Sequence, residues 1–327
     1  FTEATKSLGR TKAKEVGRYA AGLSSKGLAV VFSLRHLAKI TQTDYRMLHA
    51  TVERKRESAN YRLFAIKKRS GGQRFIHAAS DGLLRVQKFI NEEILQKPNA
   101  HVASFAFHSS GGIHRCAAAH CGARWLLQFD LKDFFYDVTE IDVYMIFRAL
   151  GYRELLAFEM ARICTTTNLP KGTHGIMERA HVLAGSKVDA RMPYLDWHGT
   201  VGVLPQGAAT SPMLSNMAAK DLDENLSQFA AEHGFVYTRY ADDIALSAFE
   251  LPSGMSIGDL QRGIVQCIRR GRFRENSAKT RVAGPGSRKL VLGLLVDGSI
   301  PRLSRQTYKR IDRHIHAATK YGLSETA

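Results

Sequence analysis

The stretch that decides the fold is Val236-Tyr-Thr-Arg-Tyr-Ala-Asp-Asp-Ile-Ala-Leu-Ser247. β-Branched and aromatic residues lead into Tyr240, and a second apolar run follows, so the pattern predicts two strands joined by a tight turn. The turn carries two adjacent carboxylates, Asp242 and Asp243, which repel each other and call for a positive partner such as a divalent metal ion. A solvated Asp-Asp turn is the alternative interpretation. Further carboxylates elsewhere in the sequence would favour the metal site over it.

A third carboxylate lies upstream of this hairpin. The apolar run Trp125–Phe129 ends at Asp130, and an acidic residue at the end of a buried strand is typical of a cleft. Three carboxylates supply the hard oxygen ligands that two Mg²⁺ ions prefer, and such a pair of ions can activate a hydroxyl and stabilise a leaving oxygen. Asp133 and Asp137 could instead be surface helix residues, an interpretation that we favour for Asp137.

A glycine-bearing loop, Leu204-Pro-Gln-Gly207, precedes a predicted helix. Ser211 and Pro212 fit the N-cap and first helical position, and apolar residues then recur every three or four positions until Gly234. A loop of this kind presents its backbone and the Gln206 side chain to a ligand. Pro-Gln-Gly also serves as an ordinary turn, so this motif indicates a ligand site only in combination with the other motifs.

Taken in order, Asp130 with Phe135, then Leu204–Gly207, then Tyr240–Asp243, resemble the motifs of reverse transcriptases. Within that family the chain is most similar to the retron reverse transcriptases of bacteria. Those enzymes carry an Asn-Ala-x-x-His segment before the first catalytic strand and a Val-Thr-Gly segment at the start of the thumb. Here Cys116–His120 has Cys in place of Asn, and Val291–Gly293 has Leu in place of Thr.

The resemblance implies an α+β, right-hand polymerase fold. Its parts are fingers, a palm made of an antiparallel sheet with helices on one face, and a short helical thumb. The expected boundaries are a basic helical N-terminal extension at 1–59, fingers at 60–122, a palm at 123–296 with an insertion near 168–202, and a thumb at 297–327 that we expect to be incomplete. In the fingers we expect strands at 61–67 and 74–78 and a helix at 83–95.

The resemblance also implies roles for individual residues. Two Mg²⁺ ions would be bound by Asp130, Asp242, Asp243 and the backbone carbonyl of Leu131. The residues expected at the incoming nucleotide are Lys67 or Lys68, Arg74, Phe135, Gln206 and Lys279. Phe135 would act as a steric gate against a 2′-hydroxyl. The residues expected at the primer or the RNA are Tyr240, Leu292, Gly293, Arg310, Arg313 and His120.

Composition agrees with a nucleic-acid partner. The 327 residues include 47 Lys and Arg but only 30 Asp and Glu, which gives a formal net charge of +17. Such a charge favours phosphate binding, because each neutralised phosphate releases counterions. No apolar run approaches the roughly 18 residues that a membrane span needs. We therefore expect no membrane association and a location in the bacterial cytoplasm.

Two local patterns leave alternatives open. His114, Cys116, His120 and Cys121 cluster as zinc ligands could, but they lack a paired Cys-x-x-Cys, so a helix that contacts RNA or packs on the palm is the favoured interpretation. Near the C-terminus, the apolar residues Tyr308, Ile311, Ile315 and Ala318 predict a thumb helix with this face packed on the core and a basic face for phosphate. A solvated basic helix is the alternative interpretation.

If the retron resemblance holds, the chain is an RNA-directed DNA polymerase that uses deoxynucleoside triphosphates to copy a structured noncoding RNA. It would prime from a 2′-hydroxyl of that RNA, leave branched RNA-linked DNA (msDNA), and work with a separate effector protein in anti-phage defence. The alternatives are another bacterial defence or group II intron-like reverse transcriptase, or a non-catalytic nucleic-acid-binding scaffold with a polymerase fold. The intact carboxylates together with Arg74, Phe135 and Gln206 favour an active enzyme.

Overall fold

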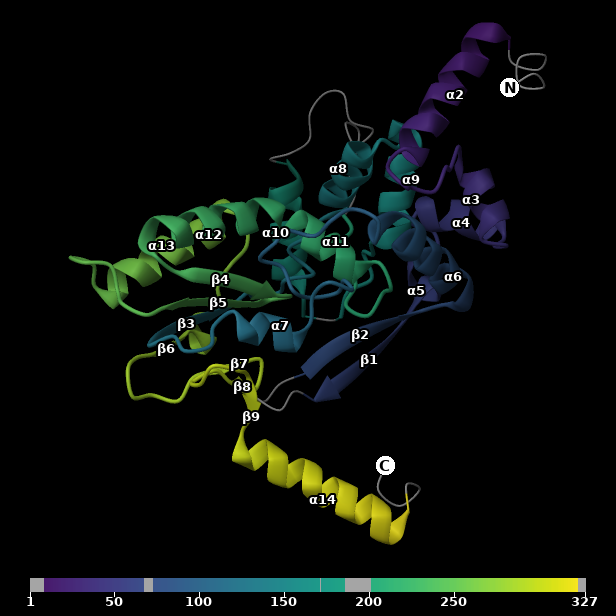
Figure 1. Ribbon diagram of the computed structural model, residues 1–327. Coiled ribbons are helices and arrows are strands. Elements are labelled where there is room, and N and C mark those ends of the chain that lie inside the picture. Colours follow the sequence, from purple (N-terminus) through teal and green to yellow (C-terminus); the bar gives the residue numbers. More distant parts are fainter. Residues whose placement is uncertain (1–8, 68–72, 171, 186–200, 323–327) are drawn as a thin grey trace. The chain divides into compact units, whose positions relative to one another are not determined.

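A computed structural model describes residues 9–67, 73–170, 172–185 and 201–322 of the chain. The chain divides into two compact units, one made of residues 1–101 and 133–221 and the other of 102–132 and 222–327. Both units combine helices with antiparallel strands, which confirms the expected α+β class (Figure 1). The division into N-terminal extension, fingers, palm and thumb stays a prediction.

The first unit is mainly helical. Its helices are α2 (Arg10–Ser24), α3 (Leu34–Ile40), α4 (Tyr45–Val52), α5 (Glu57–Asn60), α6 (Asp81–Ile90), α8 (Glu140–Leu150), α9 (Glu154–Cys164), α10 (His174–Gly185) and α11 (Ser211–Ala218). The first four of them fill most of the segment that the sequence pattern indicated as helical. Leu37 and Leu48 of α3 and α4 are fully buried as packing residues, whereas Ile40, at the end of α3, is 39% exposed.

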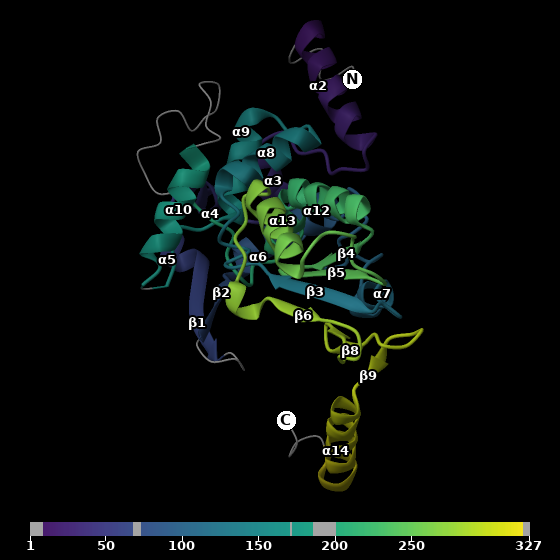
Figure 2. The ribbon, with the colours of Figure 1, turned by 90° about the vertical axis from the view of Figure 1, so that its left-hand side faces the viewer.

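A two-stranded hairpin completes the first unit. Strands β1 (Tyr61–Lys67) and β2 (Gln73–Ala79) pair antiparallel, close to the predicted strands at 61–67 and 74–78 (Figure 2). The helix predicted at 83–95 is present as α6, which continues into a π-helical turn, η1 (Asn91–Leu95).

A buried ionic cluster in the first unit fixes the start of the segment that leads to Gln206. The Glu140 carboxylate accepts hydrogen bonds from the guanidinium groups of Arg54 and Arg162 and from the Gly202 amide, the last at 2.8 Å. Burial raises the pKa of Glu140, but the two guanidinium ions outweigh it and hold that pKa below its ordinary value. Because Glu140 stays ionised and bonded, residue 202 is held against α8.

The second unit is built on one antiparallel sheet. Its strands are β3 (Trp125–Asp130), β4 (Val236–Tyr240), β5 (Asp243–Ala248) and β6 (Arg281–Ala283), in the order β4-β5-β3-β6. Helices α12 (Lys220–His233) and α13 (Ile257–Arg270) cover one face, as predicted for the palm (Figures 1 and 2). On the other face lie α7 (Ile113–Ala118) and a small sheet of β7 (Leu290–Val291), β8 (Leu294–Leu295) and β9 (Arg302–Leu303).

The single helix predicted from Ser211 to Gly234 is wrong. The structure has two helices, α11 and α12, separated at Ala219, where ψ is 9° rather than helical. The helix start is also displaced by one residue, because Thr210 is the N-cap. The Ser211 hydroxyl does not cap the helix, since it donates to the carbonyl of Pro205 at 2.7 Å and so ties α11 to the preceding loop.

The predicted thumb helix is present as α14 (Arg305–Tyr321), whose N-cap Ser304 accepts a hydrogen bond from the Thr307 amide. Its apolar face is not packed as expected: Tyr308 is 67% exposed and Ile315 is 60% exposed. Among the described helices, none is both long enough and apolar enough to cross a membrane.

Candidate active site

The three predicted carboxylates come together at one end of the second unit's sheet. Strands β3 and β5 pair so that Asp130 lies directly opposite Asp243. The turn that precedes β5 is joined to β3 by the Leu131 amide, which donates to the carbonyl of Asp242 at 2.9 Å. Sequence positions more than a hundred residues apart therefore deliver three carboxylates to one place because the strands are antiparallel neighbours.

The turn that carries Asp242 is strained and held by a buried arginine. Ala241 has a φ of 57°, in the left-handed region that residues with a Cβ rarely adopt. The Arg239 side chain, which is fully buried, donates to the Ala241 carbonyl at 3.1 Å. Its guanidinium also makes two hydrogen bonds to the carboxylate of Asp223 on α12, at 2.7 and 2.6 Å. Arg239 thus anchors the turn at Ala241 and Asp242 to the helix layer.

Sequence reasoning missed this anchor, although one signal for it exists. Arg239 is a charged residue inside an apolar strand, two positions after Tyr237, and residues with that spacing share one face of a strand. The Tyr237 hydroxyl donates to the same Asp223 carboxylate at 2.7 Å. A charged residue on a buried strand face indicates that a buried partner must exist.

A second segment holds Asp130. The Asn276 side-chain amide donates to one oxygen of the Asp130 carboxylate at 2.9 Å, and the Lys279 ammonium donates to the other at 2.6 Å. The Asn276 backbone amide also donates to the Asp130 carbonyl. The hydrogen bond to Asp130 raises the pKa of Lys279. Lys279, the last residue of the 3₁₀ turn η2 (Ser277–Lys279), therefore lies at the carboxylates, and its place at the nucleotide stays a prediction.

The site carries a net negative charge, because three carboxylates face one ammonium, that of Lys279. Burial, and then the neighbouring carboxylates of Asp242 and Asp130, raise the pKa of Asp243 to about 6, while Lys279 acts against this shift. A divalent cation would relieve this repulsion, and carboxylate oxygens are the ligands that Mg²⁺ prefers. The chemistry of the donor set therefore fits the expected ions.

The arrangement of the side chains is a separate matter. Within the described ranges, no group of three His, Cys, Asp or Glu side chains is placed to hold a metal ion. Both oxygens of Asp130 are turned toward Lys279 and Asn276 instead. The two-ion site stays a prediction, and the zinc alternative at His114, Cys116, His120 and Cys121 gains no support.

His120 lies inside the second unit and not on its surface. Its side chain is fully buried, with Nδ1 2.7 Å from the Ser247 hydroxyl and Nε2 2.7 Å from the Thr238 hydroxyl. Burial lowers its pKa to about 4, so the ring is neutral at ordinary pH. The predicted role of His120 at the RNA stays a prediction, and the burial of the ring gives no support to a direct contact. The ring connects the α7 region to β4 and β5.

The residues predicted to contact the primer gather beside the carboxylates. Tyr240, Leu292 and Gly293 line a hollow of about 310 Å³ together with Asp243. Leu292 and Gly293 join β7 to β8 and have φ values of 51° and 83°, as a two-residue hairpin loop of type I′ requires. Arg310 and Arg313 are exposed on α14, and their contact with RNA stays a prediction.

In the first unit, Gln206 lies against strand β2. Its carbonyl accepts a hydrogen bond from the His77 amide at 2.8 Å. The next residue must be glycine, because Gly207 has a φ of 112° and a Cβ there would meet a side-chain carbon of Ile76 at 2.9 Å. The loop predicted to face the nucleotide is thus packed on the strand that carries Arg74.

Two of the cations predicted at the triphosphate lie on the β1–β2 hairpin. Lys67 and Arg74 are exposed at the end of the hairpin where the chain passes from β1 to β2, and Lys67 pairs there with Gln73. Lys68 lies outside the described residues. The ring of Phe135, the predicted steric gate, is half-buried, with its centroid 5.6 Å from that of Phe134.

The interpretation of Asp137 as a surface residue is wrong. Its side chain is almost fully buried, and its carboxylate accepts a hydrogen bond from Arg179 of α10 at 2.8 Å. Helix α10 belongs to the predicted insertion near 168–202, of which 171 and 186–200 lie outside the described residues. This part of the insertion is therefore a helix of the first unit, bonded to Asp137.

Comparisons with known proteins agree with the motifs. A model of the family described as "Reverse transcriptase (RNA-dependent DNA polymerase)" matches residues 66–291. The retron Ec86 reverse transcriptase of Escherichia coli is 28% identical over 90% of this chain and 80% of its own length. Two retron reverse transcriptases of Myxococcus xanthus are also similar. Retron Mx65 is 33% identical over 82% of this chain, and retron Mx162 is 28% identical over 90% of it.

The chain spans 58% and 61% of the lengths of these two Myxococcus relatives. Among solved structures, a telomerase from Candida albicans in complex with a fragment of telomeric RNA aligns with 78% of this chain and 50% of its own at 14% identity. Its TM-score of 0.43 adds nothing to the sequence comparisons. The expected resemblance to retron reverse transcriptases is confirmed by the relatives named above.

Proposed function

This chain belongs to the reverse transcriptase family of RNA-dependent DNA polymerases, and we propose that it is the polymerase of a retron. The observation that carries the proposal is the gathering of Asp130, Asp242 and Asp243, with Lys279 beside them, at the end of the β4-β5-β3-β6 sheet. A decayed scaffold would have no reason to keep three repelling carboxylates together, because their repulsion costs free energy. An active polymerase is therefore favoured over a non-catalytic one.

The proposed reaction is the attack of a primer hydroxyl on a deoxynucleoside triphosphate. Bound Mg²⁺ would supply activation of that hydroxyl and stabilisation of the leaving oxygen, with Asp130, Asp242, Asp243 and the Leu131 carbonyl as its protein ligands. Lys279 balances the charge of Asp130 and would donate a proton to pyrophosphate. Tyr240, Leu292 and Gly293 would seat the primer end.

The remaining residues would hold the nucleotide. Lys67 or Lys68 and Arg74 would neutralise the triphosphate; of these, Lys67 and Arg74 are exposed on the β1–β2 hairpin. Gln206 would lie along the sugar and base, and the ring of Phe135 would exclude a 2′-hydroxyl by its bulk. Deoxynucleotides would then be preferred over ribonucleotides.

In the wider proposal, the template is a structured noncoding RNA, primed from one of its own 2′-hydroxyls, and the product is msDNA. The charge of +17 supports RNA as a resident partner. A separate effector protein, a role in anti-phage defence and a cytoplasmic location belong to the same proposal and rest on the retron resemblance alone. Another bacterial reverse transcriptase is the second candidate, because Cys116 and Leu292 depart from the retron pattern.

The test of the polymerase is the variant Asp242→Asn. It should abolish nucleotide incorporation on a supplied primer–template with Mg²⁺, while RNA affinity stays nearly unchanged, because one charge is a small part of the whole field. Asp221→Asn, the same change at an exposed position, is the matched control and should keep full activity. Undiminished DNA synthesis by Asp242→Asn would contradict the assignment of this site.

A further inference from the structure

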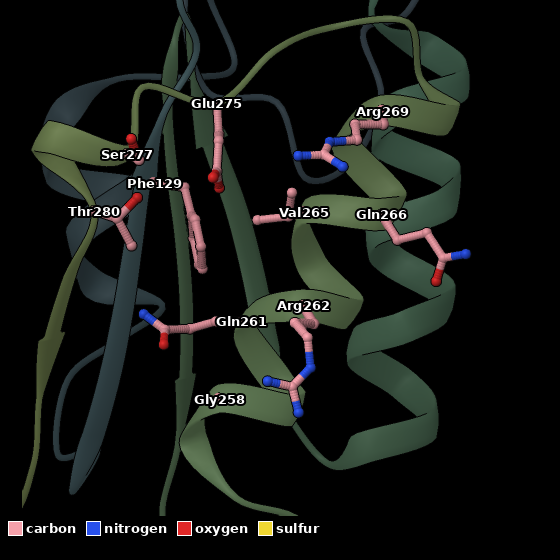
Figure 3. A pocket seen from close by; sticks show the side chains of 10 residues that line it. All are labelled: Phe129, Gly258, Gln261, Arg262, Val265, Gln266, Arg269, Glu275, Ser277 and Thr280. Carbon is pink, nitrogen blue, oxygen red and sulfur yellow. The ribbon is translucent and has the colours of Figure 1, made fainter.

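A second hollow lies in the second unit, lined by none of the three aspartates. It has a volume of about 760 Å³, within the range of roughly 300–1,000 Å³ that ligand sites occupy. Helix α13 forms one wall, and β3 with the segment from Glu275 to Thr280 forms the other (Figure 3). Figure 3 shows the Arg269 and Glu275 side chains pointing into this hollow, whereas Gln266 points away from it.

Several polar side chains of this hollow have no hydrogen-bond or ion-pair partner among the described residues. In the part of the chain that the structure describes, the side chains of Gln261, Arg269 and Glu275 make no hydrogen bond or ion pair. The Thr280 hydroxyl is buried and also has no hydrogen-bond partner there. A buried polar group is normally bonded, so an unbonded one beside a hollow indicates a ligand that supplies the missing bond.

The chemistry of the walls matches an unpaired nucleobase. Phe129 and Val265 are apolar and suit the flat face of a base. Arg269 offers donors and Glu275 offers acceptors, and the edge of a base carries both kinds of group. Arg262, at the N-terminal part of α13, is ion-paired with Asp259 but exposed, and it suits the phosphate of the same nucleotide.

We propose that this hollow binds one unpaired nucleotide of an RNA strand, with a base that bears an amino group. The Glu275 carboxylate needs N–H donors, which guanine, adenine and cytosine supply. Uracil would present carbonyl oxygens on either side of its one N–H and would be repelled. Guanine is the best match, because Arg269 can donate to its O6 and N7 while its N–H groups face the carboxylate.

RNA is favoured over a protein partner on charge. The chain is strongly basic, and α13 carries one further exposed arginine beyond the hollow, Arg270. Bases in single-stranded loops are the parts of RNA that proteins read on their edges. The inference rests on the proposed function only in taking RNA as the partner, since it concerns a site apart from the reaction.

The experiment uses the full chain and labelled eight-nucleotide oligouridine probes that carry one central guanosine or uridine. Affinities are measured by fluorescence anisotropy without Mg²⁺ or nucleotides. The unchanged protein should bind the guanosine probe about tenfold more tightly, the scale of one good base contact. Glu275→Gln should erase this preference while it leaves affinity for the uridine probe equal or tighter. A central 6-thioguanosine should crosslink to residues 257–280.

Matched controls separate specific from general effects. Arg269→Gln should reduce the guanosine preference, whereas Arg270→Gln, the same charge loss on the same helix outside the hollow, should weaken both probes equally. The proposal is overturned if Glu275→Gln keeps the preference for guanosine or if the crosslink maps outside residues 257–280. It is also overturned if Arg269→Gln and Arg270→Gln have the same effect on both probes, which is the result expected of a hollow that binds protein. DNA synthesis by the unchanged protein on a supplied primer–template is measured separately, so loss of the proposed polymerase function would be recognised on its own.

Discussion

Arg239 is the residue whose position explains most about the candidate site. A fully buried guanidinium is costly to desolvate, and here Asp223 compensates it through two hydrogen bonds. A pair of this kind contributes little net stability compared with apolar residues, yet it fixes geometry, because the guanidinium also holds the Ala241 carbonyl. The left-handed Ala241 persists because its surroundings determine it.

Substitutions of Arg239 should therefore distinguish its contribution to folding stability from its role in positioning the turn at Ala241. Arg239→Met leaves the Asp223 carboxylate buried without its cation and should lower the free energy of unfolding by about 3–5 kcal/mol. Arg239→Lys keeps a positive charge, so it should retain more stability, but its single nitrogen cannot reproduce the fork in which separate guanidinium nitrogens bind Asp223 and the Ala241 carbonyl. Its nucleotide incorporation should fall even at temperatures where it is fully folded.

Urea unfolding and primer extension on the same preparations measure the two effects. If Arg239→Lys is folded and incorporates nucleotides as fast as the unchanged protein, Arg239 has no part in positioning the turn.

His120 makes stability depend on pH. Its ring is neutral in the folded protein because burial lowers its pKa to about 4, while in the unfolded chain the pKa returns to its ordinary value of 6.5. Between these two values the unfolded chain binds the extra proton, so stability is present above pH 6.5 and is lost as pH falls toward 4. From pH 7 to pH 5 this residue should remove about 2 kcal/mol from the free energy of unfolding.

The measurement is urea unfolding at pH 7, 6 and 5 for the unchanged protein and for His120→Gln. The variant should be less stable at pH 7, because Ser247 and Thr238 lose a partner, but it should lose less stability on acidification. Equal pH dependence in the two proteins would contradict the buried, neutral ring.

At the scale of single residues, the sequence predicts the carboxylates of the candidate site but not the residues that hold them in place. Asp242 and Asp243 can be predicted because like charges on an apolar hairpin demand compensation. His120 stands out for its place in a motif, but its burial depends on Ser247, 127 residues away in the chain. Side-chain partners of that kind arise from the fold, and no local pattern encodes them.

At the scale of elements, the loop Leu204–Gly207 depends on how closely it approaches β2. Gly207→Ala adds strain at a φ of 112° and places a carbon 2.9 Å from Ile76 and 3.0 Å from the His77 carbonyl. The loop must then move off β2, and Gln206 with it. We expect a loss of about 1–3 kcal/mol in stability and a higher KM for deoxynucleotides.

Gly151→Ala is the matched control for this change. Gly151 has the same φ of 112° in the same unit, but a Cβ there would meet its neighbours at ordinary contact distances of 3.6 Å. It should cost stability through backbone strain and leave KM unchanged. Equal KM values for both variants and the unchanged protein would show that the loop does not position the nucleotide.

Helices and strands are predicted most accurately from the sequence where turn residues mark their ends clearly. The two hairpins have alternating apolar residues and marked turns, so the predicted limits of β1, β2, β4 and β5 are close to the observed ones. The break at Ala219 escapes prediction because neither Gly nor Pro marks it, and the apolar repeat continues across it. The apolar face of α14 is exposed although it was expected to pack, because periodicity shows that a face exists and not what covers it.

At the scale of the whole molecule, the formal charge of +17 should give affinity for any RNA. That affinity depends steeply on salt, because it comes from released counterions, whereas contacts specific to a structured RNA survive higher salt. A retron polymerase needs a dedicated RNA, so the protein should purify with one stem-loop RNA that stays bound at salt concentrations that strip other RNAs.

The exposed basic residues of α14 are the proposed location of this selectivity. Replacing Arg310 and Arg313 with Glu should reduce selective binding and self-primed synthesis more than extension of a supplied primer–template. Replacing Lys12 and Lys14 of α2 with Glu changes the net charge equally, and both lysines are exposed. This control should weaken RNA binding in general and leave the ratio between cognate and unrelated RNA unchanged, because nonspecific phosphate contacts do not depend on sequence. If both double variants lower that ratio equally, selectivity does not reside on α14. If the unchanged protein copies any primed template and purifies with no single RNA, the retron proposal fails. A general bacterial reverse transcriptase is then the better description.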